Sequence, residues 1–118
     1  MGVKLTRDSI LEMNDRATQE IDVPEWGGVV TIKEWGLPER GAFVEVMEKR
    51  TSGEVGMSDA MALCVVLSVV DENGARIFTD KDVALVSRKS GKAAERIFAA
   101  AMSLNMVTRK EVETLEGN

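Results

Sequence analysis

The chain has 118 residues, of which 44% are hydrophobic and 30% charged, a balance that allows one folded core and excludes wholesale disorder. Fifteen Lys and Arg residues against 20 Asp and Glu residues give a net charge of −5. An acidic chain without a clustered basic stripe is poorly suited to gripping phosphates, so nucleic acid is not an expected partner.

The first predicted elements are a short helix and a β-hairpin. Thr6 caps a helix that is predicted to run to about Ala17. Apolar and polar residues then alternate on both sides of a turn that contains Pro and Gly. This pattern predicts two half-buried strands joined by a loop of about five residues, at residues 21–23 and 30–32. A lone hairpin is marginal in water, so Trp26 and Trp35 are expected to pack it onto the rest of the chain.

Two longer helices are predicted next. Pro38 suits the first turn of a helix that runs to about Arg50, because its missing N–H is not needed there. Residues 59–70 are apolar almost all round, and a helix without a polar face is normally surrounded by protein. Their valine content leaves a buried strand as the alternative, but their length and their Ala, Met and Leu residues favour a central core helix.

The remaining chain predicts a turn and shorter helices. A turn signal covers residues 71–74, after which Ile77 and Phe78 are expected to return to the core. Capping residues predict three further helices, which begin near residues 79, 90 and 108; the second ends near residue 104. The prediction is a single domain, residues 1–118, of the α+β class but mainly α, with a small N-terminal β-hairpin packed on a bundle of four to five helices.

The side chains that most enzymes use are missing from the sequence. It has no histidine and no tyrosine, and its one cysteine, Cys64, lies in an apolar run where it acts as a small hydrophobe. Without histidine, the thiol has no ordinary base partner and His/Cys ligation of zinc is excluded by count. The acidic residues at 71–73 and 79–82 are explained as turn and cap residues. We therefore expect no enzymatic activity, no cofactor and no bound metal.

The sequence also predicts a soluble protein of a reducing compartment. One cysteine cannot form an intrachain disulfide, and the N-terminal stretch has no apolar signal core. The longest apolar run, residues 60–70, has 11 residues and contains Ser68, whereas a membrane span needs roughly 20. We expect a cytoplasmic location and no membrane partner.

Seven methionines suggest an adaptable binding surface, because Met is flexible and polarizable. Met61 is expected to fill the core, and Met47 fits either the core or a surface. The second half of the helix that ends near residue 104 is apolar on two sides, so another element or a partner must cover it. The candidate partner-binding residues are Trp26, Met47, Ala99, Met102 and Met106.

Four stretches carry a family resemblance: VPEWGG with the following VVTIKEW, the LPER helix start, VVDENGARIFTDKDV, and KSGKAAERIFAAAMSLN. Their order and spacing, over roughly residues 7–116, resemble the tail assembly chaperones of long-tailed bacteriophages. The resemblance implies a non-enzymatic, mainly helical protein that coats the aggregation-prone tape measure protein in the host cytoplasm. It also implies recruitment of tail tube protein, self-association as a homo-oligomer, and departure before the virion is complete.

Two other functions stay open at this point. One is a small phage structural or head–tail joining protein that is retained in the virion. The other is a helix-turn-helix regulator built from residues 79–101, against which the acidic net charge counts. Trp26 likewise has two interpretations: it folds back to pin the hairpin onto the helices, or it stays exposed as a contact for tube protein or a neighbouring copy.

Overall fold

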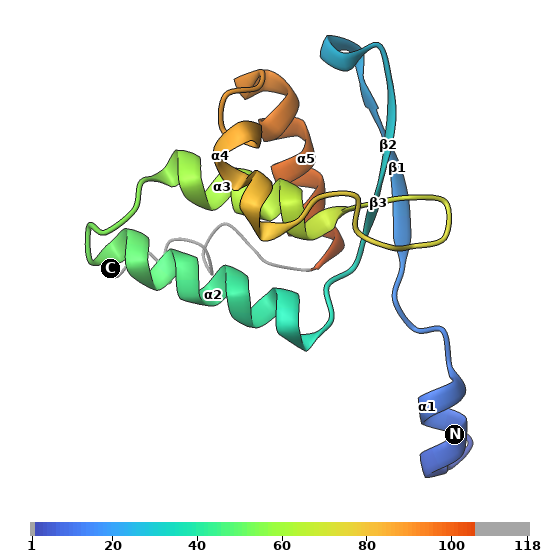
Figure 1. The fold of residues 1–118 in the computed structure, drawn as a ribbon. Helices are drawn as coiled ribbons and strands as arrows, with labels where there is room; N and C mark the ends of the chain where they lie inside the picture. Colours follow the sequence, from blue (N-terminus) through green and yellow to red (C-terminus); the bar gives the residue numbers. More distant parts are fainter. Residues whose placement is uncertain (1, 106–118) are drawn as a thin grey trace.

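The computed structural model describes residues 2–105, which form a small antiparallel sheet beside a cluster of helices (Figure 1). The strands pair in the order β1 (Thr18–Val23), β2 (Gly28–Lys33) and β3 (Val69–Val70). The longer helices are α2 (Leu37–Thr51), α3 (Met57–Ser68) and α5 (Gly91–Leu104), and the short ones are α1 (Arg7–Glu12) and α4 (Val83–Val86). The prediction of a mainly helical α+β fold with an N-terminal hairpin on a helix bundle is confirmed. The helix predicted from residue 108 lies outside the described residues.

The hairpin presents one apolar face to the helices. Its register places Ile21 opposite Val30 and Val23 opposite Gly28, so these side chains share a face with Ile32. Val23 and Ile32 are fully buried, and α5 packs against both strands from this side. The opposite face of the sheet carries polar residues and the exposed Val29. The predicted alternation of buried and exposed positions is therefore confirmed.

The predicted helix at residues 59–70 is correct over most of its length but ends early. α3 stops at Ser68, and Val69 and Val70 pair with Ile32 and Thr31 of β2 to form the third strand. The physical reason is that β-branched valines fit a pleated surface, and the open side of β2 offers them backbone partners. The rest of α3 is the central core helix that was predicted, with Ala60, Cys64, Val65 and Val66 fully buried.

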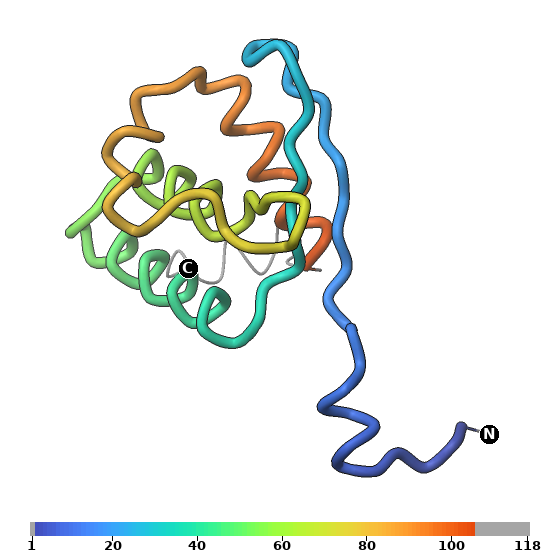
Figure 2. The backbone as a smooth tube through the Cα atoms, turned by 45° about the vertical axis from the view of Figure 1, so that its right-hand side comes forward, coloured from blue at the N-terminus to red at the C-terminus, as the bar shows by residue number. Residues whose placement is uncertain are grey.

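The predicted N-terminal helix is too long. Thr6 does cap it, since the Ser9 N–H donates to Thr6 Oγ1 at 3.2 Å, but α1 ends at Glu12 and residue 13 is already extended. None of its residues is buried, and Ile10 and Met13 are each about half exposed, so no core contact prolongs the helix. α1 stands apart from the rest of the molecule in both views (Figures 1 and 2).

One tryptophan joins four elements at the base of the hairpin. The Trp35 side chain is buried, its indole N–H donates to Ser68 Oγ of α3 at 2.9 Å, and its ring lies 4.9 Å from that of Phe43 of α2. Its backbone N–H donates to the side-chain oxygen of Asn105 at 2.9 Å, at the end of α5. The expectation that Trp35 packs the hairpin onto the helices is confirmed.

Replacing Trp35 tests this junction. We expect Trp35→Ala to lower the free energy of unfolding by about 3–5 kcal/mol, because it removes a buried aromatic ring. Ser68→Ala should lower it by about 1–3 kcal/mol, because the indole N–H loses its buried partner. Chemical denaturation measures both values.

Leu37→Ala is the control, since Leu37 is 84% exposed, and it should stay within about 0.5 kcal/mol of the parent. A cost for Trp35→Ala as small as that of the control would contradict this role of the junction.

Candidate functional site

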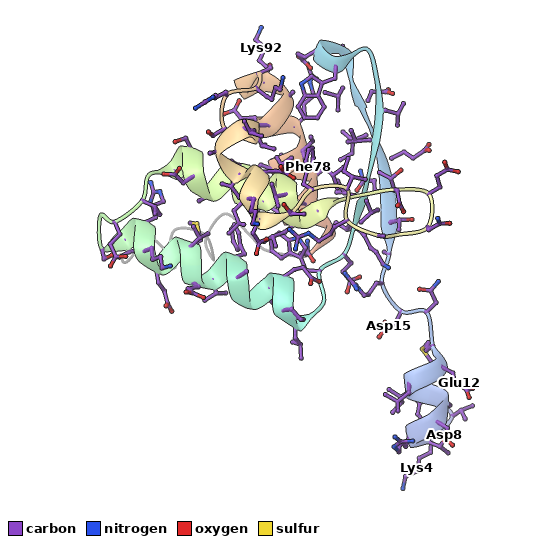
Figure 3. All side chains as sticks on the ribbon, in the orientation of Figure 1. Lys4, Asp8, Glu12, Asp15, Phe78 and Lys92 are labelled. Carbon is purple, nitrogen blue, oxygen red and sulfur yellow. The ribbon has the colours of Figure 1, made fainter. Side chains whose placement is uncertain are left out.

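An open, mainly apolar cleft lies between the hairpin tip and α4. Its volume is about 450 Å³, and its lining residues are Trp26, Phe78, Asp82, Leu85, Val86 and Lys89. Leu85 is 56% exposed and Trp26 is 37% exposed, so both present apolar surface to solvent. Phe78 is partly buried and packs against the core from the segment that precedes α4 (Figure 3). An exposed apolar hollow with a polar rim is typical of a site where another molecule binds.

The hairpin tip is shaped by its own short sequence. Pro24–Trp26 form a turn of 3-10 helix, and the Gly27 N–H donates to the Pro24 carbonyl at 3.0 Å. Gly27 has a φ of +71°, a left-handed conformation that side chains with a Cβ disfavour. This turn places Trp26 at the end of the hairpin, above the helices.

An ion pair ties the tip to α5. The Arg96 guanidinium donates to both carboxylate oxygens of Glu25, from Nε at 3.2 Å and from Nη2 at 2.9 Å. The hydrogen bond from Arg96 lowers the pKa of Glu25, and the same bond raises the pKa of Arg96. Since Glu25 directly precedes Trp26, this two-point contact sets where the tryptophan stands relative to the helices.

The wall of the cleft that lies opposite Trp26 begins with a capping box. The Thr79 N–H donates to Asp82 Oδ2 at 2.8 Å at the start of a 3-10 turn, Asp80–Asp82, that leads directly into α4. The Arg76 guanidinium donates to Asp80 at 2.9 Å and to the Val66 carbonyl at 3.1 Å, which ties the turn to α3. The predicted cap at Thr79 is confirmed.

A smaller, mainly apolar cleft of about 320 Å³ lies next to the first one. It shares Val86 and Lys89 with the larger cleft, and Met61 and Ala94 lie along its wall. Two mainly apolar hollows thus border the connection between α4 and α5, and Lys89 lines both of them. Lysine keeps its charged end in water while its alkyl chain covers apolar surface, so Lys89 can follow the shape of a bound group.

The structure places the candidate residues predicted from the sequence in different environments. Trp26 lines the cleft, and Ala99 is exposed on α5 but is not part of the cleft wall. The sequence left Met47 and Met102 open between a covered position and a partner-binding surface, and in the structure both are buried, Met47 fully and Met102 with 8% of its surface exposed. Met47 lies on the face of α2 that also carries Phe43, and Met102 follows the buried Ala101, so both are covered by neighbouring elements. Met106 lies outside the described residues.

Leu85 lines the cleft although it was not predicted as a site residue, and Ile77 lies outside the core in which it was predicted. Leu85 lies in α4 together with Val83 and Val86. Val83 and Val86 are three residues apart and share one face of the helix, whereas Leu85 follows Val83 by two residues and lies on another side. This spacing was the available signal for an exposed leucine. Ile77 was expected in the core but is 52% exposed, because it follows the loop over the outer face of the sheet.

The acidic groups singled out in the sequence serve the local backbone. Asp71 Oδ1 accepts from the N–H groups of Asn73 and Ala75 at 2.8 and 3.0 Å, as expected for a turn residue. Among residues 2–105, no cluster of three or more His, Cys, Asp or Glu side chains is placed to hold a metal ion. Burial raises the pKa of the Cys64 thiol to about 12, so this group stays protonated in the core. Within the same residues, no helix is both long and apolar enough to cross a membrane.

Comparisons with known proteins give one family match and one match in fold. A family model described as phage tail assembly chaperone matches residues 7–115. A solved structure described as the bacteriophage HK97 tail assembly chaperone is similar in fold, with a TM-score of 0.61 and 19% identity. The match covers 83% of this chain and 89% of that chain. No curated protein sequence matches.

The ion pair at the tip predicts an unusual titration of Glu25. A lowered pKa means that the pair stabilises the fold fully above the ordinary carboxyl range, and that this contribution is lost as the pH falls through the lowered value. Arg96→Gln should raise the pKa of Glu25, which an NMR titration of its carboxyl carbon measures. Lys92→Gln should raise it less, because Lys92 acts only through its more distant charge. Equal shifts in the two variants would contradict the ion pair.

Proposed function

The chain belongs to the phage tail assembly chaperone family, and from this premise we propose that it binds and solubilises the tape measure protein during tail assembly. The observation that carries the proposal is the open apolar cleft of about 450 Å³ between Trp26 and α4. A tape measure protein is long and helical, and it exposes apolar stripes until the tail tube surrounds it. Covering these stripes would prevent their aggregation in the host cytoplasm.

The cleft suits an apolar stripe on a helix. Helix-in-groove binding inserts side chains spaced three or four residues apart into an apolar hollow. Trp26 and Leu85 supply apolar surface on the two sides of the hollow, and large aromatic side chains are common anchors at interfaces. Lys89 and Asp82 place one charge of each sign on the lining, so the surroundings of the hollow remain polar.

We attribute adaptability to a varying client to side chains of the cleft, and not to Met47 or Met102. Met47 and Met102 are in the core, so they cannot form the contact surface of the folded chain. Leu85 and Lys89 are exposed side chains of the cleft, and Met61 borders the smaller hollow beside them. A client whose apolar stripe changes in size along its length can therefore still be covered by successive copies.

Recruitment of tail tube subunits is the second part of the proposal, and it needs a second surface. The outer face of the sheet carries a wide groove of about 640 Å³, bordered by the loop at residues 71–77 and containing Val29 and Ile77, which are each about half exposed. This groove lies on the side of the sheet that faces away from α5, so both surfaces can be occupied together. The chaperone then leaves before the virion is complete, and mass spectrometry of purified particles should not detect it.

Co-expression tests the cleft directly. With the tape measure protein of the same phage, the parent chain should shift that protein from the insoluble to the soluble fraction. Trp26→Ala and Leu85→Asp should each weaken binding by about 30-fold or more, which is about 2 kcal/mol for an anchor residue. Titration calorimetry with a soluble tape measure fragment measures the change.

Leu37→Asp is the matched control, because Leu37 is exposed at the start of α2, far from the hairpin tip (Figure 1). It should leave binding unchanged, and an acidic residue is well tolerated at a helix start. Each variant is first checked by thermal unfolding. If folded Trp26→Ala and Leu85→Asp chains bind like the parent, the cleft is not the client site; if the parent does not solubilise the client, the proposed function fails.

A further inference from the structure

The wall of the cleft opposite Trp26 is one face of a short helical segment. The 3-10 turn leads into α4, and the helical hydrogen bonds continue beyond it, since the Lys89 N–H donates to the Val86 carbonyl at 3.0 Å. Spacings of three and four residues place side chains on one side of a helix. Four of the six residues that line the cleft have this spacing: Asp82, Leu85, Val86 and Lys89. We call these four residues the strip.

The strip carries an acid at one end, apolar side chains in the middle and a base at the other end. Lys89 is exposed, Leu85 is 56% exposed, and Asp82 is partly buried. The two charged residues are seven positions apart, which corresponds to roughly 10–14 Å along a helix. A partner that covers the strip therefore meets a negative end and a positive end, with apolar surface between them.

Both charges of the strip are available to a partner. Within residues 2–105, no ion pair includes Asp82 or Lys89. Asp82 Oδ2 accepts from the Thr79 N–H at 2.8 Å, but a carboxylate can accept several hydrogen bonds. Capping thus explains the acid at position 82, whereas the exposed lysine at the opposite end has no such local task in the described chain.

Other charged groups around the cleft are engaged elsewhere. On the hairpin side, both carboxylate oxygens of Glu25 accept from Arg96. At the 3-10 turn, Asp80 pairs with Arg76 at 2.9 Å, and Lys81 lines a separate hollow together with Arg76. The two ends of the strip are therefore the charges that a molecule in the cleft meets directly.

Charge complementarity orients a helix on this strip. An acid beside Lys89 and a base beside Asp82 form attractive pairs, whereas the reverse placement brings like charges together. In an antiparallel pair of helices, the positive N-terminal end of each lies beside the negative C-terminal end of the other, so this orientation is favoured. An antiparallel partner meets Lys89 first along its own chain, and its acid therefore precedes its base.

We propose that the cleft selects helical client segments in which an acid precedes a base by seven residues, with apolar residues at the third and fourth positions after the acid. The segment binds antiparallel to residues 80–89, and its apolar pair enters the hollow between Leu85 and Trp26. This inference rests on the proposed function and specifies which parts of the client are bound. It also gives every bound copy the same direction along the client, because the client sequence has a polarity.

Overlapping 21-residue peptides of the tape measure protein of the same phage test the selection. Fluorescence anisotropy measures binding of the full-length chain to each peptide. We expect the acid-to-base pattern to be about threefold more frequent among bound peptides than among unbound ones. Equal frequencies would overturn this inference and leave the proposed function standing, whereas a complete lack of bound peptides would contradict both, since both need a helix in the cleft.

A charge exchange tests the role of Lys89. For one bound peptide, replacing its acid with lysine should weaken binding to the parent chain about fivefold, and Lys89→Glu should restore the affinity for this altered peptide. Lys4→Glu is the matched control, because it changes the net charge equally and lies in the N-terminal arm, away from Phe78 of the cleft (Figure 3). Equal effects of the two variants, or no recovery in the exchanged pair, would reject the proposed contact.

Disulfide trapping tests the direction of binding. Arg88 and Lys81 are exposed and directly precede Lys89 and Asp82, so they mark the two ends of the strip, and the native Cys64 is buried. A peptide with a cysteine next to its acid should crosslink to an Arg88→Cys chain about tenfold more than to a Lys81→Cys chain. A cysteine next to its base should reverse this preference. The opposite preference, or none, would overturn antiparallel binding.

Discussion

The buried Trp35 junction is the contact on which the arrangement of the whole chain depends. Its ring packs on Phe43 of α2, its indole N–H is satisfied by Ser68 of α3, and its backbone N–H is satisfied by Asn105 at the end of α5. Trp35 directly follows the hairpin, so one residue fixes the base of the sheet against the three longer helices. A buried polar group must find a partner, and here each partner comes from a different element, which leaves few alternative packings.

The candidate site lies at the other end of the hairpin, where the attachment is of a different kind. The tip is held by the exposed Glu25–Arg96 ion pair, and not by burial of Trp26 in the core. Trp26 is neither buried in the bundle nor fully exposed, and it lines one side of the apolar hollow. Because the ion pair already positions this wall in the free chain, the proposed binding of a client would cost less conformational entropy.

Among residues 2–105, most of the large exposed apolar side chains lie in three places, the cleft, the outer face of the sheet and the N-terminal arm, and Leu37 is a separate one at the start of α2. Leu85, Val29 and Leu5 are each more than half exposed, whereas α3 is almost entirely covered. A protein whose proposed task is to cover apolar stripes on another chain must keep such surface accessible and still remain folded. Asp82 and Lys89, the two charged residues of the cleft lining, and the exposed acidic residues Glu20 and Asp22 of β1 disfavour unspecific contacts between the open surfaces.

Local patterns were sufficient for much of the fold. The alternation in the hairpin, the apolar helix around Cys64 and the caps at Thr79 and Ser90 all depend on residues near in sequence, and the structure contains each of them. Tertiary packing decided the rest: Val69–Val70 became a strand because β2 was available, and Met47 and Met102 became core because neighbouring elements covered them. For the same reason the cleft was not predictable, since its walls, Trp26 and Leu85, are far apart in sequence and meet only when the Trp35 junction and the Glu25–Arg96 pair hold the hairpin beside α4 and α5.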